Sequence, residues 1–310
     1  MQRLDKWVTK PPSNQLFYHS PKEVISKLAP YLKDETQSLS QNEQKDLDKG
    51  AKAYNLYDFQ KFATEELLKR LKTYGVALLA DPVGSGKTLS ALAVASMYKR
   101  IAIITPPKLK AQWESYKDSD NEFILNQNLE FYTYDEATRK THKQSFLKNA
   151  DLVIVDESHH FRNPNKRYSN LKEKLGSESH LLLLSATPIN NNYLDLAYQL
   201  TLNKSSLIIN DQELKPIEIC KQADKLANEN EESILNTDYY KLCNLIFSRS
   251  AKEIVSYLKA IGKSLPAKNI QIKNFSSIPS HIDFNINRLL DILGVNDTKD
   301  STKDSIKFCI

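Results

Sequence analysis

The chain has 310 residues, of which 43 are basic and 38 acidic, so its formal net charge is +5. A hydrophobic content of 40% is ample for a buried core, and the modest positive charge is compatible with a nucleic-acid partner without demanding one. The three cysteines are isolated, which argues against a disulfide framework or a zinc site, and no apolar run approaches the ~18 residues of a membrane span, so we expect an intracellular protein with no membrane partner.

Residues 1–50 are predicted to form an N-terminal extension and a polar linker. Within this part, Ser20 and Pro21 favour a helix from Lys22 to Leu32. The stretch from Asp34 to Lys49 is rich in Asp, Glu, Gln, Ser and Lys, a composition typical of a solvated linker or of an exposed helix. None of the candidate site residues lies in this part of the chain.

A regular alternation of strands and helices is predicted over residues 51–205. Helical patterns lie between short apolar runs of the kind found in buried parallel strands. This order predicts an α/β fold, with a parallel sheet covered by helices on both faces and a site formed by the loops at the carboxyl ends of the strands. The runs lie near 76–80, 101–105, 129–134, 152–156 and 181–185.

Residues 206–310 are more polar and are predicted to be mostly helical, as an extension of the preceding lobe. Their strongest helical pattern runs from Lys241 to Ile261. The last forty residues give no pattern from which an element can be assigned.

A glycine-bent turn follows the first predicted strand and opens a helical pattern rich in Ala and Leu. The order of strand, turn and helix is that of a phosphate-binding loop, although Asp81 stands where the full consensus has glycine. In such a loop, backbone N–H groups close around phosphate oxygens, the lysine reaches the β and γ phosphates, and the next hydroxyl ligates Mg²⁺. An ordinary turn before a helix is the alternative. The candidate binding residues are Gly84, Ser85, Gly86, Lys87 and Thr88.

An acidic pair, Asp156 and Glu157, follows the apolar run from Leu152 to Val155. Asp156 can hold a Mg²⁺ ion that bridges two phosphates, and Glu157 can orient and deprotonate the water that attacks the γ phosphate. By itself such a pair would be a solvated turn after a strand, but together with a phosphate-binding loop it predicts phosphoryl transfer. We expect the loop and the pair to lie side by side on neighbouring strands.

Two small hydroxyl residues, Ser185 and Thr187, follow the last predicted strand, where an ordinary turn ending at Pro188 is the alternative. His159 has no cysteine or third histidine near it in the sequence, which argues against a metal site. We expect His159 to link the nucleotide site to the loop after Leu184 by a hydrogen bond.

Taken in order, these motifs resemble the helicase-like superfamily 2 of nucleic-acid motor ATPases, and within it the Snf2-type DNA translocases, over roughly residues 52–270. The loop is similar to D-E-M-G-L-G-K-T, which accounts for Asp81. The segment from Asp156 to Lys166 resembles D-E-A-H-R-I-K-N-x-x-S-K, with Ser158 in place of alanine. The other similar segments are Leu56–Gln60 (L-R-x-Y-Q), Ile104–Trp113 (the segment that leads to an N-W or Q-W pair), Leu184–Asn191 (L-T-G-T-P-L-Q-N), Phe247–Ser250 (R-R-T-K) and Leu265–Lys268 (L-P-P-K).

This resemblance implies a RecA-like lobe that binds ATP with Mg²⁺ and contacts adenine through Gln60. In the family, a second RecA-like lobe supplies arginines that stabilise charge on the transferring phosphoryl group. The sequence has no Q-x-x-G-R-x-x-R-like segment, which is where the resemblance would place these arginines. We therefore expect the chain to be the first lobe, and the second lobe to be supplied in cis by a longer polypeptide or in trans by a separate subunit. Because arginine fingers contribute on the order of 10³ to 10⁵ in rate, the chain alone should hydrolyse ATP poorly.

The resemblance also implies contacts with the phosphate backbone of double-stranded DNA. Basic side chains at strand ends can neutralise phosphates, although for any single lysine a solvated surface charge is the more common role. The aromatic residues Trp113, Tyr132 and Tyr134 are expected in the core rather than as platforms for bases. The candidate nucleic-acid residues are Lys108, Lys110, Arg162 and Lys166.

The sequence therefore predicts an ATP-dependent motor lobe that translocates on double-stranded DNA or remodels it. A lobe of an RNA or single-strand DNA helicase is one alternative, because the Asp-Glu-Ser-His element suits it equally. The segments Asn163–Lys166 and Leu265–Lys268 favour the Snf2 branch. A second alternative is a nucleic-acid-binding module that uses bound nucleotide only as a structural switch and does not hydrolyse it.

Overall fold

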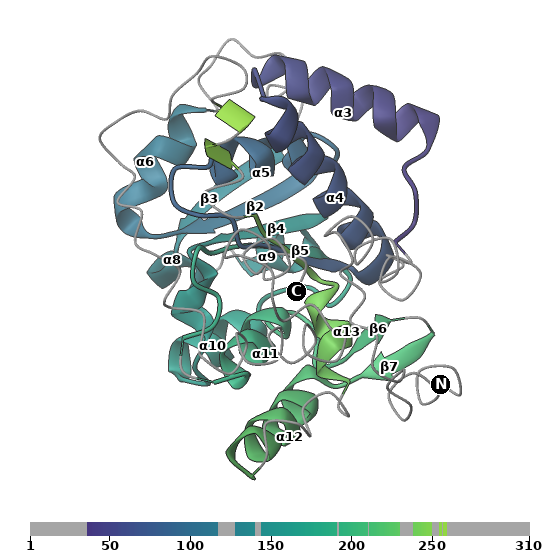
Figure 1. Cartoon of the computed structure of the whole chain (residues 1–310). Coiled ribbons are helices and arrows are strands. Elements are labelled where there is room, and N and C mark those ends of the chain that lie inside the picture. Colours follow the sequence, from purple (N-terminus) through teal and green to yellow (C-terminus); the bar gives the residue numbers. More distant parts are fainter. Residues whose placement is uncertain are drawn as a thin grey trace, which may run out of the picture.

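The computed structural model describes residues 36–116, 128–139, 144–190, 192–209, 211–229 and 238–249, together with residues 254, 255, 257 and 258 (Figure 1). The predicted helix at 22–32 and the segment 265–268 lie outside the described residues. Among the described residues, no helix has both the length and the apolar character required to cross a membrane.

Six strands of the described residues form one sheet in which every pairing is parallel. The five strands predicted from the sequence are all present, to within one residue at each end. β8, at one edge, was not predicted. The order across the sheet is β3 (Asn128–Thr133), β2 (Arg100–Thr105), β4 (Leu152–Asp156), β5 (His180–Leu184), β1 (Val76–Leu79) and β8 (Ile246–Phe247).

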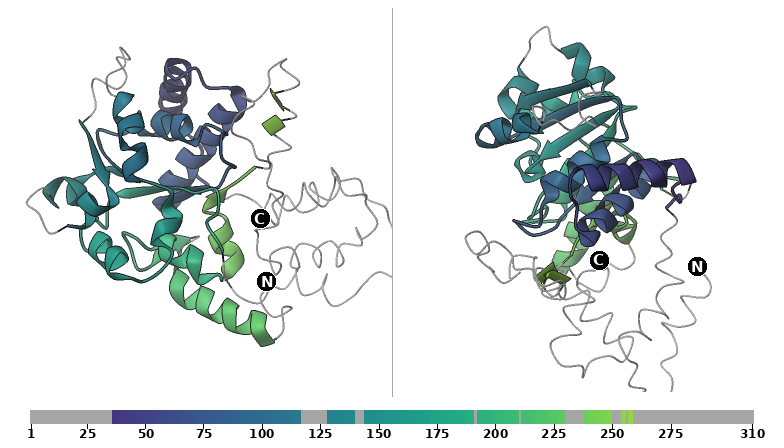
Figure 2. Two further views of the ribbon diagram at one scale, coloured as in Figure 1. Left: turned by 90° about the vertical axis from the view of Figure 1, so that its left-hand side faces the viewer. Right: turned by 90° about the horizontal axis from the view of Figure 1, so that it is seen from above.

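Helices cover both faces of this sheet, as predicted (Figures 1 and 2). The first layer consists of α3 (Gln41–Ala53), α4 (Asp58–Tyr74), α5 (Lys87–Ala95) and α6 (Pro107–Ser115). The second layer consists of α8 (Tyr134–Thr138), α9 (Gln144–Asn149), the 3₁₀ helix η1 (Ser158–Phe161), α10 (Lys166–Lys172) and α11 (Leu194–Leu200).

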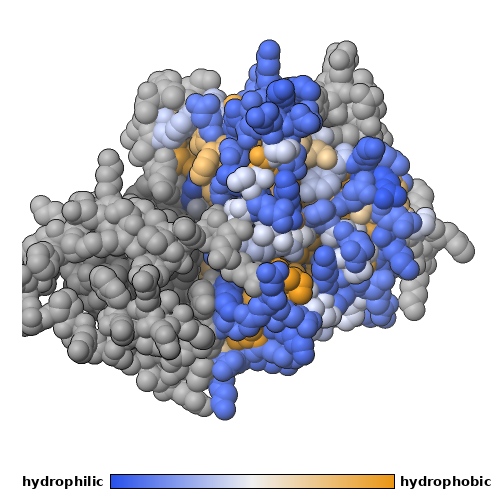
Figure 3. Space-filling view, turned by 90° about the vertical axis from the view of Figure 1, so that its right-hand side faces the viewer, coloured by the Kyte–Doolittle hydropathy of each residue, from blue (hydrophilic) through white to orange (hydrophobic). Residues whose placement is uncertain are grey.

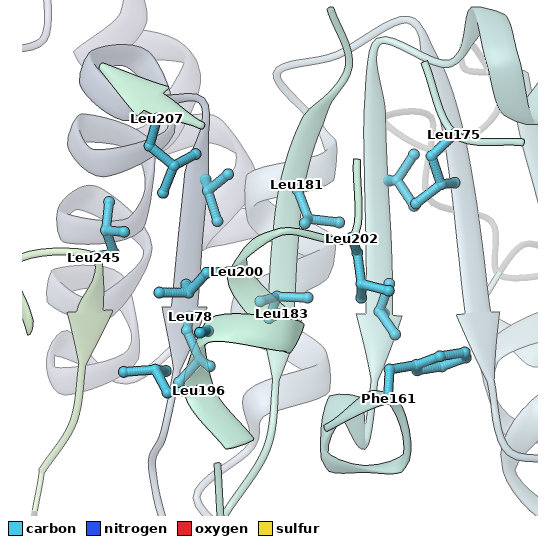
Figure 4. Packing of buried hydrophobic residues seen from close by; sticks show 14 of the residues in the cluster. Leu78, Phe161, Leu175, Leu181, Leu183, Leu196, Leu200, Leu202, Leu207 and Leu245 are labelled. Atoms are coloured by element: carbon cyan, nitrogen blue, oxygen red, sulfur yellow. The ribbon is translucent and has the colours of Figure 1, made fainter. Parts of the chain in front are cut away.

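The period-two alternation of the strands divides the core into two clusters, one under each layer. In β1, Ala77 and Leu79 pack with the first layer, and Val76 and Leu78 pack with the second. In the second cluster, leucines of the sheet meet leucines of α11 and of the segment before β8 (Figure 4). β1, β2, β4 and β5 are buried on both faces along nearly their whole length, and they carry the continuous apolar runs that identified them in the sequence.

The first helix of the described chain settles the choice left open for the stretch before residue 50. Ser40 and Glu43 form a reciprocal capping box at the start of α3, and Leu47 on its inner face is fully buried. α3 is therefore a packed helix with one exposed side rather than a solvated linker. On the side where α3 lies in Figure 1, the described surface is mainly hydrophilic, with hydrophobic residues only in small separate patches (Figure 3).

The prediction of a single helix from Lys241 to Ile261 is wrong. α13 (Tyr239–Cys243) is short, and the chain then enters β8, where the Leu245 and Phe247 carbonyls accept hydrogen bonds from the N–H groups of Leu78 and Ala80, each at 2.8 Å. Without β8, β1 would be the edge of the sheet and its backbone N–H groups would lack these partners. The hydrogen bonds that β8 supplies to β1 outweigh the helical periodicity of the local sequence. The part after 205 also contains the antiparallel pair β6 (Leu207–Ile209) and β7 (Gln212–Leu214), before α12 (Pro216–Glu229).

Candidate functional site

The glycine-bent turn joins β1 to α5 at the carboxyl edge of the sheet. Gly84 and Gly86 adopt left-handed conformations, with φ of 84° and 83°, and Gly86 is the N-cap of α5. A Cβ atom at Gly86 would lie 2.1 Å from Nε2 of Gln60. Both the backbone conformation and the close approach of Gln60 therefore require glycine at this position.

Gln60 lies directly against this turn, in the first turn of α4, and is almost fully buried. Its Nε2 donates to the Ser85 carbonyl at 3.0 Å, and its Oε1 accepts from the backbone N–H of Tyr57 at 3.0 Å. The predicted adenine-contacting residue thus also connects α4 to the loop. The buried Ser85 hydroxyl has no hydrogen-bond partner among the described residues.

Lys87 begins α5 and bends back over the turn. Its Nζ donates to the carbonyls of Asp81 at 2.8 Å and Pro82 at 3.2 Å. Burial lowers the pKa of Lys87, while the negative charge of Glu157, followed by those of Asp81 and Asp156, acts in the opposite direction. The lysine therefore lies within the field of the acidic pair, and Thr88 follows it on the same helix turn.

An ion pair that was not predicted holds the first residue of the turn. Arg249, which follows β8, donates to the buried Asp81 carboxylate from its backbone N–H at 2.9 Å, from Nε at 3.3 Å and from Nη2. Its guanidinium also lies over the rings of Phe59 and Phe247, 5.0 and 5.1 Å from their centroids. The similarity to R-R-T-K marked this arginine in the sequence, but nothing there named its partner.

Asp156 ends β4 with its carboxylate almost fully buried. Oδ2 accepts from the indole N–H of Trp113 at 2.9 Å and from the Thr105 hydroxyl at 3.3 Å, and Oδ1 accepts from the N–H of Glu157 at 3.0 Å. Burial raises the pKa of Asp156, as does the charge of Glu157, while the Trp113 hydrogen bond opposes this. Trp113 is a core residue, as predicted, but its bond to Asp156 was missed.

Glu157 has a left-handed backbone, at φ 48° and ψ 49°, and is one of three non-glycine residues with positive φ in the described part of the chain. The Tyr134 hydroxyl holds this turn by donating to the carbonyls of Asp156 at 2.7 Å and Glu157 at 3.2 Å. The His159 ring, with Nδ1 3.2 Å from Oε2 of Glu157, lowers the pKa of that carboxyl through a hydrogen bond. A strained turn held by a buried hydroxyl is typical of functional sites.

The turn after β4 is joined to the loop after β5 by a histidine contact of the predicted kind. Nδ1 of His159 lies 3.3 Å from the Ser185 hydroxyl oxygen, which also accepts from the N–H of Thr187 at 3.2 Å. The Thr187 side chain itself is exposed.

A second bridge between the same two loops was missed. The Ser158 hydroxyl donates to Oε1 of the fully buried Gln199 at 2.8 Å, and Nε2 of Gln199 donates to the Pro188 carbonyl at 2.5 Å. The sequence shows that serine replaces the family's alanine at position 158. It does not show the partner of Ser158, because Gln199 lies 41 residues away on α11.

The loops after β1, β4 and β5 thus meet at one edge of the sheet, as expected for parallel strands. The expectation that the glycine turn and the acidic pair lie on neighbouring strands is wrong, because β5 separates β1 from β4. Because β5 lies between β1 and β4, the loop after β5, which contains Ser185, lies between the glycine turn and the acidic pair.

The candidate nucleic-acid residues lie in two segments of the chain, one after β2 and one after β4. Lys108 and Lys166, in the first turns of α6 and α10, are exposed, and Arg162 is half-buried after η1. Lys110 is paired with Glu136 at 2.8 Å. The aromatic residues Trp113, Tyr132 and Tyr134 are all buried, which confirms the prediction that they belong to the core.

Comparison with known proteins adds the family. Residues 110–281, more than half of the chain, match the family model described as SNF2-related domain. The chain belongs to this family. The match extends from α6 through the acidic pair to beyond β8, while the glycine turn lies before it.

The chain is also similar to parts of longer proteins. It is 33% identical over 140 residues to the uncharacterized ATP-dependent helicase YqhH of Bacillus subtilis, covering 39% of this chain and 24% of that protein. It is 31% identical over 146 residues to the RNA polymerase-associated protein RapA of Vibrio atlanticus, covering 36% of this chain and 15% of that protein. The matched parts are therefore less than a quarter of these relatives' lengths.

Among solved structures, the chain is similar to a SWI2/SNF2 ATPase core of Sulfolobus solfataricus in complex with double-stranded DNA. The similarity covers 67% of this chain and 46% of that one, with 23% sequence identity and a TM-score of 0.45.

Proposed function

We propose that this chain is the nucleotide-binding first lobe of an ATP-dependent motor that translocates on double-stranded DNA or remodels it. The observation that carries the proposal is the convergence of the glycine turn, with Lys87, and the acidic pair Asp156 and Glu157 at one sheet edge. Membership of the SNF2-related family and similarity to YqhH, which is named an ATP-dependent helicase, support the same class of activity.

The residues present fit a magnesium-bound triphosphate. The unpartnered buried hydroxyl of Ser85 and the glycine backbone at the N-terminus of α5 offer donors to phosphate oxygens, and Lys87 can exchange its two carbonyl partners for phosphate. The Thr88 hydroxyl and the Asp156 carboxylate are the oxygen ligands that Mg²⁺ prefers. When bound, the ion would neutralise charge that develops on the phosphates.

The chain's own residues then divide the remaining tasks. Glu157, whose pKa is held low by its hydrogen bond with His159, is ionised at neutral pH and can accept a proton from water. Gln60 is proposed to contact adenine from the first turn of α4. The His159–Ser185 contact is proposed to couple changes at the acidic pair to the conformation of the loop that contains Thr187.

Contact with the phosphate backbone of DNA is proposed for Lys108, Arg162 and Lys166, which follow β2 and β4 at the same edge of the sheet as the nucleotide residues. Lys110 would have to exchange Glu136 for a phosphate. We further propose that a second RecA-like lobe, in cis or in trans, completes the site with arginines, which contribute on the order of 10³ to 10⁵ in rate.

The test is ATP turnover with and without duplex DNA, on this chain and on a form that carries the second lobe. We expect duplex DNA to stimulate turnover of the longer form. Equal or greater stimulation by single-stranded DNA or RNA would instead favour the helicase alternative. Tight ATP binding with no turnover in the longer form would favour the nucleotide switch.

Two variants test the site itself. Lys87→Ala should abolish nucleotide binding, and retained ATPase activity in that variant would reject the assignment of the loop. In the form that carries the second lobe, Glu157→Gln should still bind ATP with Mg²⁺ but stop turnover, so an unchanged rate in that form would remove Glu157 as the base.

A further inference from the structure

The Asp156 carboxylate is held from both sides by three hydrogen-bond donors. The Trp113 indole and the Thr105 hydroxyl donate to Oδ2, and the backbone N–H of Glu157 donates to Oδ1. An ionised carboxylate offers about four lone-pair directions, so about one remains for a further ligand. The donors therefore determine the direction from which a cation can approach.

Of the two side-chain donors, Trp113 makes the shorter hydrogen bond to Asp156. Its ring is 1% exposed and packs in the cluster between the sheet and the first helical layer, so its orientation is fixed by its neighbours. The indole N–H can only donate, and a distance of 2.9 Å to Oδ2 is typical of a hydrogen bond to a charged acceptor. The hydrogen bond from the Thr105 hydroxyl is longer, at 3.3 Å, and its hydrogen can rotate about the Cβ–Oγ1 bond.

We propose that Trp113 is a positioning residue for the metal-binding carboxylate: through its indole N–H, α6 holds Asp156 in the orientation that receives Mg²⁺. The inference rests on the proposed function, because it takes Asp156 as the magnesium ligand. It goes beyond a packing role, since phenylalanine would fill most of the same volume without donating a hydrogen bond.

The experiment measures the affinity of a fluorescent, non-hydrolysable ATP analogue for the wild-type chain and for Trp113→Phe. Each protein is titrated in EDTA and at a series of Mg²⁺ concentrations. Loss of a group that orients a metal ligand typically costs about 10-fold to 100-fold in metal affinity. We expect Trp113→Phe to bind the analogue in EDTA with the wild-type affinity. The Mg²⁺ concentration that gives half of the magnesium-dependent increase in affinity should be about 10-fold to 100-fold higher than for the wild-type chain.

Gln112→Ala is the matched control, because Gln112 is the preceding residue of α6 and its side chain is exposed. It should follow the wild-type curve at every Mg²⁺ concentration. Wild-type Mg²⁺ dependence in Trp113→Phe would overturn the inference. An equal loss of affinity in EDTA and in Mg²⁺ would also overturn it, because that is the result of a packing defect.

A measurement on the intact site does not depend on the folding of Trp113→Phe. The chain has two tryptophans, Trp7 and Trp113, so Trp7→Phe leaves a single indole signal in isotopically labelled protein. Its N–H resonance should move when Mg²⁺ is added to the nucleotide complex, and an unmoved resonance would overturn the inference. If the wild-type chain shows no magnesium-dependent nucleotide binding, the proposed function fails first and the inference falls with it.

Discussion

Replacement of Arg249 by methionine should destabilise the lobe strongly, because it leaves a buried carboxylate without its counter-ion. Asp81 is 1% exposed, and the Arg249 guanidinium donates to both of its carboxylate oxygens. Removing one partner of a buried pair typically costs about 3–5 kcal/mol. Since about 1 kcal/mol corresponds to roughly 2–4 °C for a domain of roughly 150–250 residues, the melting temperature should fall by about 6–20 °C.

The same change should weaken nucleotide binding. The Asp81 carbonyl accepts from Nζ of Lys87, so loss of the ion pair releases the start of the loop as well as the segment after β8. Arg249→Lys is the matched control: it keeps the charge but loses the two-pronged contact, and its effect should be intermediate.

The assay is a double-mutant cycle with Asp81→Asn, followed by thermal or urea unfolding. We expect the double variant to be less destabilised than the sum of the two single variants, because no unpaired charge remains buried. A cost below about 1 kcal/mol for Arg249→Met, as for an exposed ion pair, would refute the reasoning. Strict additivity of the two single changes would refute it equally.

Three further outcomes are expected. Gly86→Ala should weaken nucleotide binding in equilibrium titrations, because the new Cβ atom would lie 2.1 Å from Nε2 of Gln60. The left-handed backbone at this position would cost alanine about a further 1–2 kcal/mol of conformational energy. Wild-type affinity in this variant would contradict the prediction. Tyr134→Phe should lower the turnover number more than it raises the KM for ATP, because it removes the hydroxyl that holds the strained turn at Glu157; equal effects on both constants would count against that role. Glu43→Gln should lower the free energy of unfolding at neutral pH, as followed by urea unfolding, by less than about 1 kcal/mol, since the Glu43 side chain is 35% exposed and solvent screens its ion pair with Lys72. The pKa of Glu43 is lowered from 4.5 to about 2 by the lysine that it contacts on α4, so the difference from wild type should shrink as the pH falls from 4.5 to about 2; a difference independent of pH would contradict the assignment.

Local patterns were sufficient for five of the six strands described in the sheet and for the residues at their ends. Apolar β-branched runs such as Leu152–Val155 can be satisfied only by burial on both faces, so their position in the sequence predicted both the strands and the parallel sheet. Because parallel strands end at one edge, the same reasoning brought the glycine turn and the acidic pair to one site.

Local patterns failed where a backbone or side chain depends on a distant partner. The segment from Lys241 has helical periodicity, but the open edge of β1 recruits Ile246 and Phe247 as a strand. Trp113 was expected only to pack, since a sequence shows that an indole is apolar but not which acceptor its N–H reaches. The contacts of Arg249 with Asp81 span 168 positions, and those of Trp113 with Asp156 span 43.

The order of residues along this chain therefore determined its class of fold, the edge of the sheet where the candidate site residues gather, and the side chains that are proposed to bind a nucleotide. The tertiary structure alone decided which strand separates the two halves of the site and which donors fix the acidic pair. It also decided that the segment after β8 returns to hold the glycine turn. Periodicity records only which face of an element is buried, whereas the choice of neighbours depends on how the whole core packs and on which buried polar groups find partners.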